Sequence, residues 1–443
     1  MRRIEVPPRP DWRRRVEAAG FDFHTMDGRL YWDEAAAWEF TAAEMDTLEL
    51  AAEQVHGLVL AACDRAVADG RLGDLGIPEA VRPLVVESWR RFRAGEGEGH
   101  LYGRFDISWA GAEDGPPKLL EYNADTPTAL LEAAVVQWTW LEDTRPDADQ
   151  FNSLHERLVA RWRERDRIGD DVPLHLAATV PHAEDEGTVA YLAATAMEAG
   201  FRTKILPVDR LGLDPASGAF VDEEGEPVRR LYKLYPWEWL LSEDFAEPLA
   251  RAVLDRRLDV VEPVWKLMAT SKAMLALLWE LNPGHPLLVP AHLDRSAFGA
   301  GAEVIAKPLF GREGANVSLA VLGPDHEPAG PPLIQTDGPY GAEGFVYQSW
   351  HPVVAATDTA GVRHHAVLGV WMVGDVACGL GLREDETTVT RNTSRFVPHF
   401  FRGSARRRGN LYRDARVERR QRPLRPDVPW PRSSPPNSAA RSP

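Results

Sequence analysis

Residues 102–128 read Y-G-R-F-D-I-S-W-A-G-A-E-D-G-P-P-K-L-L-E-Y-N-A-D-T-P-T, a stretch with an unusual charge pattern. Successive side chains of a strand point to opposite faces, so Arg104 and Asp106 share one face with Ser108, while apolar residues occupy the other. After a turn rich in Gly, Pro and Asp, the alternation resumes. The sequence therefore predicts an antiparallel hairpin in which Glu121 and Asn123 lie on the face of Arg104 and Asp106.

One face of this hairpin would carry an arginine, two carboxylates and an amide. Such hard oxygen ligands suit Mg²⁺, which takes one or two protein carboxylates and fills its other positions with water and phosphate oxygens. The adjacent Arg104 would then hold the anion. The alternative interpretation is a solvated strand face with a cross-strand ion pair. The stretches that follow in the chain favour the metal site.

Length and composition limit the classes of protein. With 443 residues, the chain exceeds a usual single domain, so two or three lobes around a shared site are expected. A content of 44% hydrophobic and 27% charged residues is ordinary for a soluble globular enzyme. The formal net charge of -16 argues against a nucleic-acid partner and is compatible with a cationic substrate.

The sequence also indicates a compartment. Cys63 and Cys378 lie far apart and offer neither a disulfide framework nor a zinc-ligand spacing. The N-terminus lacks an apolar signal core, and no run of apolar residues is long enough to span a membrane. A cytoplasmic protein without a membrane partner is expected. The sequence does not indicate an oligomeric state.

Periodicity predicts the scaffold. A helix is expected over residues 40–67, with Thr41 as N-cap and Glu44 completing a capping box, and further helices over 78–92 and 129–141. A strand at 174–180, a helix at 189–199 and a strand at 203–206 predict a small α/β lobe of parallel character. The acidic residues 184–186 before that helix fit either a helix N-terminus or a contact with an amine.

A second informative stretch, at residues 302–317, reads A-E-V-I-A-K-P-L-F-G-R-E-G-A-N-V. A strand ends near Lys307, a Gly-rich turn follows around Arg312, and a second strand begins, which is how a flap over phosphates is built. It is neither a Walker A loop nor a Rossmann fingerprint, because no G-K-[ST] and no helix follow. Gln348 lies on the next strand, and a hairpin at 366–382 leads to Arg383.

These elements predict four segments. Residues 1–170 would hold N-terminal helices and the metal-binding hairpin, 171–260 the small α/β lobe, and 261–400 the nucleotide-binding lobes. Residues 401–443 form an arginine- and proline-rich tail that cannot bury enough apolar surface to order itself.

The chain resembles the synthetase domain of glutathionylspermidine synthase and its amidase-lacking relatives. The resemblance runs from about residue 20 to 400. It is carried by six collinear stretches: R-F-D at 104–106, E-Y-N-A-D at 121–125, S-K-A-M-L-A-L-L-W at 271–279, A-K-P-L-F-G-R-E-G-A-N at 306–316, V-Y-Q-S-W at 346–350 and L-R-E-D-E at 382–386. It implies an α/β (α+β) class ATP-grasp fold with a small pre-ATP-grasp lobe.

The resemblance also implies an activity and a set of roles. The family joins a carboxylate to an amine by phosphorylating the acid with ATP and letting the amine attack the acyl phosphate. The implied Mg²⁺ ligands are Asp106, Glu121 and Asn123, and the implied ATP contacts are Lys272, Lys307, Gln348 and Arg312. Arg104 and Arg383 would contact the transferring phosphoryl group, since this chemistry depends on positioning and on neutralising negative charge.

The substrate half departs from the family pattern. Thr126 and Thr128 replace two serines that follow the E-Y-N-A-D motif, and residues 233–238 read K-L-Y-P-W-E in place of K-T-W-A-W-E. Whether the acid is a small molecule or a peptide, and whether the amine is a polyamine, stays open. The alternative function is an ATP-grasp-like module that binds nucleotide or peptide without turnover. Retention of all the charged residues named above favours the ligase.

Overall fold

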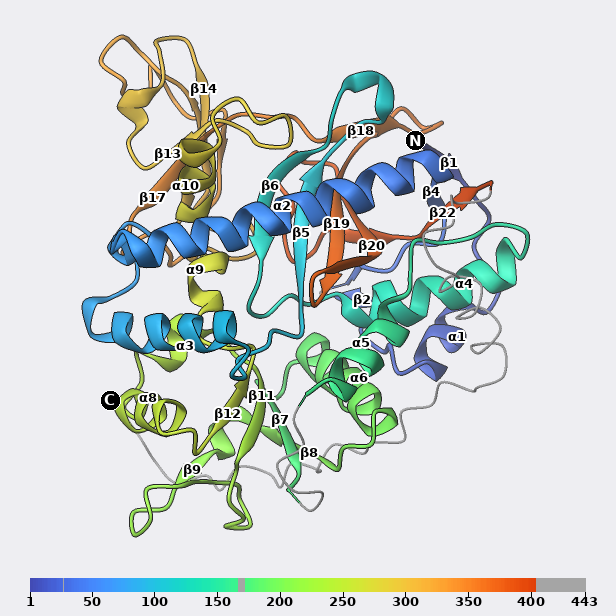
Figure 1. Ribbon diagram of the computed structural model, residues 1–443. Helices are drawn as coiled ribbons and strands as arrows, with labels where there is room; N and C mark the ends of the chain where they lie inside the picture. Colours follow the sequence, from blue (N-terminus) through green and yellow to red (C-terminus); the bar gives the residue numbers. More distant parts are fainter. Residues whose placement is uncertain (27, 166–171, 404–443) are drawn as a thin grey trace, which may run out of the picture.

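The computed structural model describes residues 1–26, 28–165 and 172–403. Figure 1 shows three larger sheets with helices packed around them: a central sheet crossed by the long helix α2, a sheet containing β13, β14 and β17, and a sheet containing β7, β8, β11 and β12. Most of the predicted basic tail, residues 404–443, lies outside the described residues. Among the described residues, no helix is long and apolar enough to cross a membrane.

The central sheet contains the predicted hairpin. Its strands follow the order β21-β20-β19-β5-β6, with β18 beside β19, and all pair antiparallel. Opposite Asn123 lies Arg104, and opposite Glu121 lies Asp106, which confirms the predicted hairpin and its shared face. The bounds are β5 Tyr102–Ser108, β6 Lys118–Asn123, β18 Val354–Thr357, β19 Arg363–Val373, β20 Val376–Asp385 and β21 Arg395–Val397.

Helices cover both faces of this sheet. Helix α2 (Ala42–Ala68) begins with the predicted capping box of Thr41 and Glu44, and it shares a core with Phe105 and Leu368 of the sheet. On the other face, Trp371 and Cys378 pack in a second core with α5 (Leu154–Arg163) and with the segment before it.

That preceding segment differs from the single α-helix expected over 129–141. Ala129 adopts a left-handed conformation with φ 66°. A π-helical segment, η4 (Glu132–Val136), then leads into α4 (Gln137–Thr144). An apolar run fixes the buried face of a helix but does not distinguish a four-residue from a five-residue hydrogen-bond period, so the prediction was wrong in the type of turn.

Two other expected helices differ in their bounds. The helix expected over 78–92 is divided into a 3-10 turn, η2 (Glu79–Val81), and α3 (Arg82–Ala94). Pro83 requires this division, because a proline is tolerated only in the first turn of a helix. Helix α6 (Ala183–Glu198) begins before the expected Val189, since the His182 side chain accepts a hydrogen bond from the backbone N–H of Asp185. The acidic residues 184–186 therefore form its first turn.

The small lobe is the predicted parallel α/β unit. Its sheet has the order β12-β11-β7-β8, and every neighbouring pair is parallel. A short antiparallel pair of β9 and β10 projects from it. The bounds are β7 Leu174–Ala178, β8 Thr203–Pro207, β9 Gly212–Leu213, β10 Phe220–Val221, β11 Arg230–Leu234, α7 Trp237–Leu240, α8 Ala246–Leu254 and β12 Asp259–Val261.

The third sheet is antiparallel and carries the predicted flap. Its order is β13-β17-β14-β15-β16, and the Gly-rich turn lies between β14 and β15. Helix α10 packs beside β13 and β17, as Figure 1 also shows. The bounds are α9 Lys266–Thr270, α10 Ala273–Leu281, β13 Ala291–His292, β14 Glu303–Pro308, β15 Ser318–Val321, β16 Ile334–Gln335 and β17 Phe345–Ser349.

The N-terminal segment closes on the C-terminal end of the described chain. A small sheet joins β1, β4 and β22. Strand β19 pairs with β5, and β20 and β21 extend the same sheet, so the segment predicted as 261–400 contributes to the central sheet too. The four segment bounds stay a prediction. The remaining bounds are β1 Arg2–Glu5, α1 Trp12–Ala18, β2 Thr25–Met26, β3 Arg29–Leu30, β4 Ala36–Thr41, η1 Arg71–Gly73, η3 Ala112–Asp114, η5 Val208–Arg210, η6 Arg295–Ala297 and β22 His399–Arg402.

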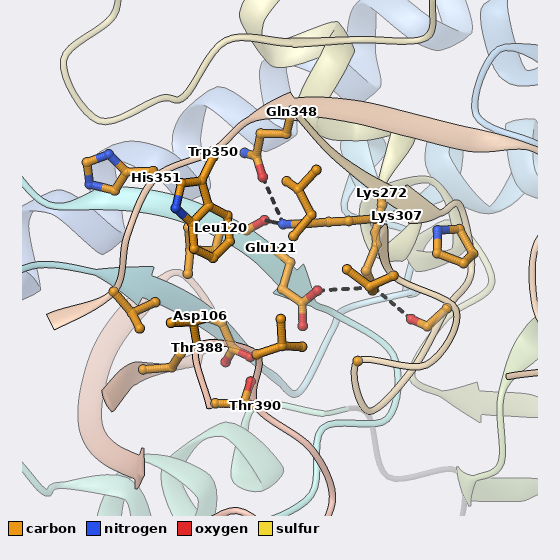
Figure 2. A pocket seen from close by; sticks show the side chains of 18 of the residues that line it. Asp106, Leu120, Glu121, Lys272, Lys307, Gln348, Trp350, His351, Thr388 and Thr390 are labelled. Carbon is orange, nitrogen blue, oxygen red and sulfur yellow. Dashed lines mark hydrogen bonds and ion pairs between the residues drawn. The ribbon is translucent and has the colours of Figure 1, made fainter. Parts of the chain in front are cut away.

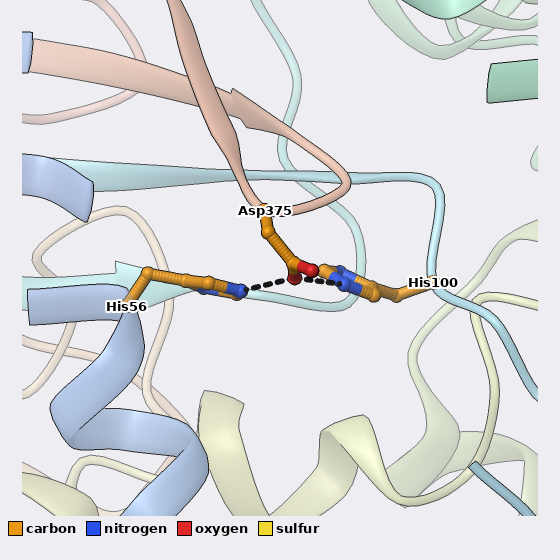
Figure 3. Close-up of side chains that lie close together, drawn as sticks. All are labelled: His56, His100 and Asp375. Carbon is orange, nitrogen blue, oxygen red and sulfur yellow. Dashed lines mark hydrogen bonds and ion pairs between the residues drawn. The ribbon is translucent and has the colours of Figure 1, made fainter. Parts of the chain in front are cut away.

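A group of titratable residues fastens α2 to the turn between β19 and β20 (Figure 3). The Nε2 atoms of His56 and His100 lie 3.0 Å and 3.1 Å from the same oxygen, Oδ1 of Asp375. Burial lowers the pKa of His100 to about 3, so its neutral ring donates to the carboxylate. Both Nδ1 atoms are buried without a partner in the described part of the chain. A metal-bound imidazole normally donates its second N–H, so the group is a hydrogen-bonded clamp rather than a metal site.

Candidate active site

A cavity lies between the hairpin of the central sheet and the flap of the third sheet (Figure 2). Strands β5 and β6 form one side, strands β14 and β17 another, and the segment after β20 a third. Predicted site residues that line it are Asp106, Glu121, Lys272, Lys307 and Gln348; Leu120, Trp350, His351, Thr388 and Thr390 are further lining residues. The structure therefore brings these five predicted residues to one place.

Lys307 and Gln348 meet at the inner end of this cavity. The ammonium of Lys307 donates to Oε1 of Gln348 at 2.8 Å and to the backbone oxygen of Leu120 at 3.0 Å. Strands β14 and β17 are paired antiparallel with Gln348 opposite Ile305, two residues from Lys307, which places both side chains on one face of the sheet. Burial lowers the pKa of Lys307 to about 8, and Glu121 offsets only part of that effect. The lysine is thus a buried cation ready to pair with an anion.

Lys272 connects the hairpin to the Gly-rich turn. Its Nζ atom lies 3.1 Å from Oε2 of Glu121 and donates to the backbone oxygen of Gly311 at 2.7 Å. Burial alone would raise the pKa of Glu121, but Lys272 and Lys307 outweigh burial and lower it. Glu121 therefore stays ionised between two lysines.

Asp106 lies between two arginines. Arg104 donates through Nε to Oδ1 at 2.9 Å, and Arg383 donates through Nη2 to Oδ2 at 2.7 Å. Burial opposes the charge of Arg104, but Asp106 and Glu121 outweigh it and raise the arginine's pKa. Figure 2 shows Asp106 and Glu121 on the same side of the cavity.

The three predicted metal ligands share one sheet face but line two adjoining cavities. Asp106 lines the first, Asn123 the second, and Glu121 both. The amide nitrogen of Asn123 lies 3.4 Å from Oε1 of Glu121, a long hydrogen bond. Two carboxyl groups beside an amide fit Mg²⁺, and the neighbouring cations suit the phosphate oxygens that would fill its other positions. The ligand set stays a prediction.

The second cavity, about 300 Å³, continues from the first past Glu121, Glu313, Gly314 and Thr390. The predicted residues Arg104, Arg312 and Arg383 line it. Arg312 donates to Oγ1 of Thr126 at 2.7 Å and to Oε1 of Glu238 at 2.7 Å, so the flap is fastened to both the hairpin and the small lobe. Arg312 accordingly faces this second cavity and not the inner end near Gln348.

Acidic residues also line the second cavity. They are Glu184 and Asp185, from the first turn of α6, and Glu313 of the flap, and His182 lies among them. Burial raises the pKa of Glu184, while the Thr128 hydroxyl and His182 counteract it. The cavity thus holds both arginines and carboxylates.

Sequence reasoning missed several lining residues. Tyr31, between β3 and β4, and the segment 388–392 after β20 contribute to the walls. Segment 388–392 follows the L-R-E-D-E motif directly, and this position could have indicated that it lines the site. The sequence around Tyr31 gives no such indication. The aromatic residues of the stretch 231–239 differ in their surroundings. Tyr232 and Trp237 are buried, whereas Trp239 lines the second cavity.

Comparisons with known proteins agree with this fold. A family model described as glutathionylspermidine synthase preATP-grasp matches residues 3–402. The chain is 37% identical over 418 residues to a Haemophilus influenzae protein named as an acid–amine ligase, covering 90% of this chain and 100% of that relative. It is 26% identical over 367 residues to trypanothione synthetase of Crithidia fasciculata, covering 78% of this chain and 53% of that relative.

Among solved structures, a glutathione synthetase-like effector from Globodera pallida, in its apo form, superposes with a TM-score of 0.54 at 10% identity. The match covers 88% of this chain and 95% of that one, and it shows the ATP-grasp-like fold alone. The family model that matches nearly the whole chain, and the long alignment at 37% identity, show the family as well as the fold. The chain belongs to the glutathionylspermidine synthase family of acid–amine ligases.

Proposed function

We propose that this protein joins a carboxylic acid to an amine with ATP and Mg²⁺, through an acyl phosphate. The observation that carries the proposal is the pair of adjoining cavities that share Glu121. One cavity holds two lysines beside carboxylates, and the other holds both arginines and carboxylates. Such an arrangement suits a nucleotide in the first and two oppositely charged substrates in the second.

The nucleotide would lie between Lys307 and Gln348 at its base end and Lys272 at its phosphates. Lys272 already holds the Gly311 carbonyl, so the flap and the lysine would enclose the phosphates together. Asp106, Glu121 and Asn123 would hold Mg²⁺, which supplies charge neutralisation for phosphoryl transfer when it is bound. No protein nucleophile is needed, because the residues act by positioning and by electrostatic stabilisation.

The acid would lie against the arginines of the second cavity. Arg312 is anchored by Glu238 and Thr126, so its guanidinium is held in a defined position for a carboxylate. Arg104 and Arg383 bracket the place where the acyl phosphate would form. The amine would enter along Glu184, Asp185 and Glu313 as a cation. We propose a small-molecule or peptide acid and an aliphatic amine or polyamine, with no nucleic-acid or membrane partner.

The test is release of ADP with Mg²⁺ against pooled carboxylates and pooled amines. We expect release to require an acid and an amine together, and the product to be an amide by mass spectrometry. Replacing Lys307 by Met should abolish it, whereas Lys118→Met should not, since Lys118 binds backbone carbonyls outside both cavities. ATP binding by calorimetry without ADP release for any pair would support the alternative, a nucleotide-binding module without turnover.

A further inference from the structure

A tyrosine on the wall of the second cavity has a buried glutamate behind it. The ring of Tyr31 packs among Phe21 and Phe23, and its residue lines the cavity. The hydroxyl of Tyr31 donates to Oε1 of Glu132 at 2.7 Å. Glu132 itself is fully buried in the π-helical segment η4. A π-helical turn inside a helix frequently marks a functional site.

The carboxylate of Glu132 is poorly compensated. Its second oxygen, Oε2, is buried without a hydrogen-bond partner among the residues that the structure describes. The titratable groups that face it are Tyr31, Glu184 of α6 and Arg104 of β5, and Arg383 faces Tyr31. Burial and the like charge of Glu184 raise the pKa of Glu132, while Tyr31 and Arg104 offset only part of that increase. A carboxylate in such surroundings takes up a proton readily.

The proposed reaction needs a proton acceptor at this end of the cavity. An aliphatic amine is an ammonium ion at neutral pH, and its nitrogen has no free electron pair with which to attack. The arginines that line the cavity cannot accept a proton. Glu184 lines the cavity, whereas Glu132 lies behind Tyr31, so the two carboxyl groups can divide the tasks of binding a cation and accepting a proton by their positions. Glu184, which lines the cavity, is placed to bind the ammonium.

We propose that Glu132 receives the proton of the amine substrate through the hydroxyl of Tyr31. This inference rests on the proposed ligase function. Tyr31 touches the amine, and Glu132 acts through Tyr31. The ammonium gives one proton to the tyrosine oxygen while the tyrosine proton passes to Oε1 of Glu132. A neutral amine and a neutral carboxylic acid result, so two opposite charges disappear from a poorly solvated region.

The amide bond then forms, and all bonds, electron pairs and protons of the step are accounted for. The freed electron pair of the amine forms the C–N bond at the carbonyl carbon, and the bond from that carbon to the phosphate oxygen breaks. Phosphate leaves with the electron pair of that bond and takes up the second proton from nitrogen. Glu132 returns its proton through Tyr31 to solvent once the products depart. No oxidant, reductant or further reactant is needed.

The test compares an amine with hydroxylamine as the nucleophile. Hydroxylamine is largely unprotonated at neutral pH, so it can trap an acyl phosphate without a proton acceptor. In Glu132→Gln, whose amide oxygen can still accept from Tyr31, we expect amide formation to fall about 10²-fold or more, in the range for loss of general-base catalysis. Hydroxamate formation should stay close to wild type. Tyr31→Phe should likewise lose amide formation and keep hydroxamate formation. Glu142 is an exposed residue on α4, and Glu142→Gln should change neither rate.

A second readout is the dependence of stability on pH. A carboxyl group whose pKa is raised on folding binds more protons in the folded state, so the free energy of unfolding falls as pH rises through that window. We expect the fall to be smaller in Glu132→Gln than in wild type, because Glu98 and Glu184, whose pKa values burial also raises, keep their contributions.

Three outcomes would overturn the inference: unchanged amide formation in Glu132→Gln, an equal loss of amide and hydroxamate in a folded variant, or an unchanged pH dependence of stability. Failure of the proposed function is distinct, because wild type would then form neither amide nor hydroxamate with any acid.

Discussion

The guanidinium of Arg383 donates a hydrogen bond to Oδ2 of Asp106 at 2.7 Å, across two strands that are not neighbours in the sheet. Strand β19 lies between them, and its Gly369 sits opposite Asp106. A Cβ atom at Gly369 would lie 2.9 Å from Cδ of Arg104, so the glycine leaves space for the arginines over the strand. The central sheet therefore assembles Arg104, Asp106 and Arg383 across one glycine.

Replacing Arg383 by Lys should lower turnover more than nucleotide affinity. A planar guanidinium can hold Asp106 and still offer a donor to a phosphoryl oxygen, whereas a lysine cannot reproduce that fork. We expect kcat to fall on the order of 10²-fold, about 2.7 kcal/mol, while the Kd for ATP changes little. Steady-state kinetics and calorimetry on the same preparation measure the two effects.

Arg363→Lys is the matched control, because Arg363 is an exposed arginine at the start of the paired strand β19 and lines neither cavity. It should leave both quantities unchanged. If Arg383→Lys keeps kcat and only raises KM for ATP, Arg383 binds nucleotide and has no part in phosphoryl transfer.

The Gly-rich turn depends on Gly314, which has a left-handed φ of 66°. A Cβ atom there would lie 2.6 Å from the backbone oxygen of Thr390, in the segment that closes the cavities. Gly314→Ala should therefore push the flap away from this segment. We expect a loss of activity of about tenfold or more and weaker protection of residues 310–315 from hydrogen exchange when a non-hydrolysable ATP analogue is added.

A substitution at Gly301 distinguishes the effect of backbone strain from that of a steric clash. It also has a positive φ, 83°, but a Cβ atom at Gly301 would meet nothing within 4 Å. Gly301→Ala should cost stability by about 1–2 kcal/mol, the cost of a left-handed residue, and should keep activity and the protection of residues 310–315. Equal effects in the two variants would show that close packing of the flap is unimportant.

The sequence predicted the parts of the site that obey a strand period. The register of Arg104, Asp106, Glu121 and Asn123 follows from alternation, because one face of the hairpin had to bury Phe105 and its neighbours. Contacts between distant loops had no such signal. The binding of Arg312 to Glu238 depends on how the flap docks onto the small lobe, which no local pattern encodes.

Other misses have different causes. In the segment after Ala129, all the residues from Glu132 to Val136 are buried, so hydrophobicity could not reveal the π-helical turn that aims Glu132 at Tyr31. Asp125 belongs to the E-Y-N-A-D motif but does not line either cavity. It is fully buried and joins the hairpin to the small lobe, since Oδ1 accepts from Lys233 at 2.5 Å and Oδ2 from the backbone N–H of Trp237 at 2.9 Å.

Replacing Lys233 by Met should therefore destabilise the fold strongly. Burial lowers the pKa of Lys233, but Asp125 opposes that effect. Each charge of the pair therefore stabilises the other. Removing one partner leaves an uncompensated buried charge, which costs about 3–5 kcal/mol. Urea unfolding should show this loss directly as a lower free energy of unfolding.

Two further variants identify the cause. Asp125→Asn combined with Lys233→Met removes the unpaired charge, so the double variant should recover part of the lost stability. Arg251→Met breaks an exposed pair with Glu247 on α8 and should have little effect. A double variant no more stable than Lys233→Met would mean that lost packing, not charge, explains the loss.

A buried histidine sets an expectation for acid stability. His399, on β22, has its Nδ1 atom 2.9 Å from Oε1 of Gln137 and accepts at Nε2 from the backbone N–H of Phe151 at 3.2 Å. Both ring nitrogens are thus used in the neutral form, with Nδ1–H donating. A second proton at Nε2 would have to displace the Phe151 bond. Burial lowers the pKa of His399 to about 3 from the ordinary 6.5.

The sign of the pH effect follows from where the proton binds. Between pH 6.5 and about 3 the unfolded chain binds a proton at His399 that the folded chain does not, so the free energy of unfolding decreases as pH falls through this window. At pH 5 this single group should remove roughly 2 kcal/mol relative to neutral pH. His399→Gln should be less stable at neutral pH, because its hydrogen bonds are disturbed, yet lose about 2 kcal/mol less on acidification. Urea unfolding at the two pH values measures the difference, and an identical pH dependence in both proteins would show that His399 can take up a proton within the folded core.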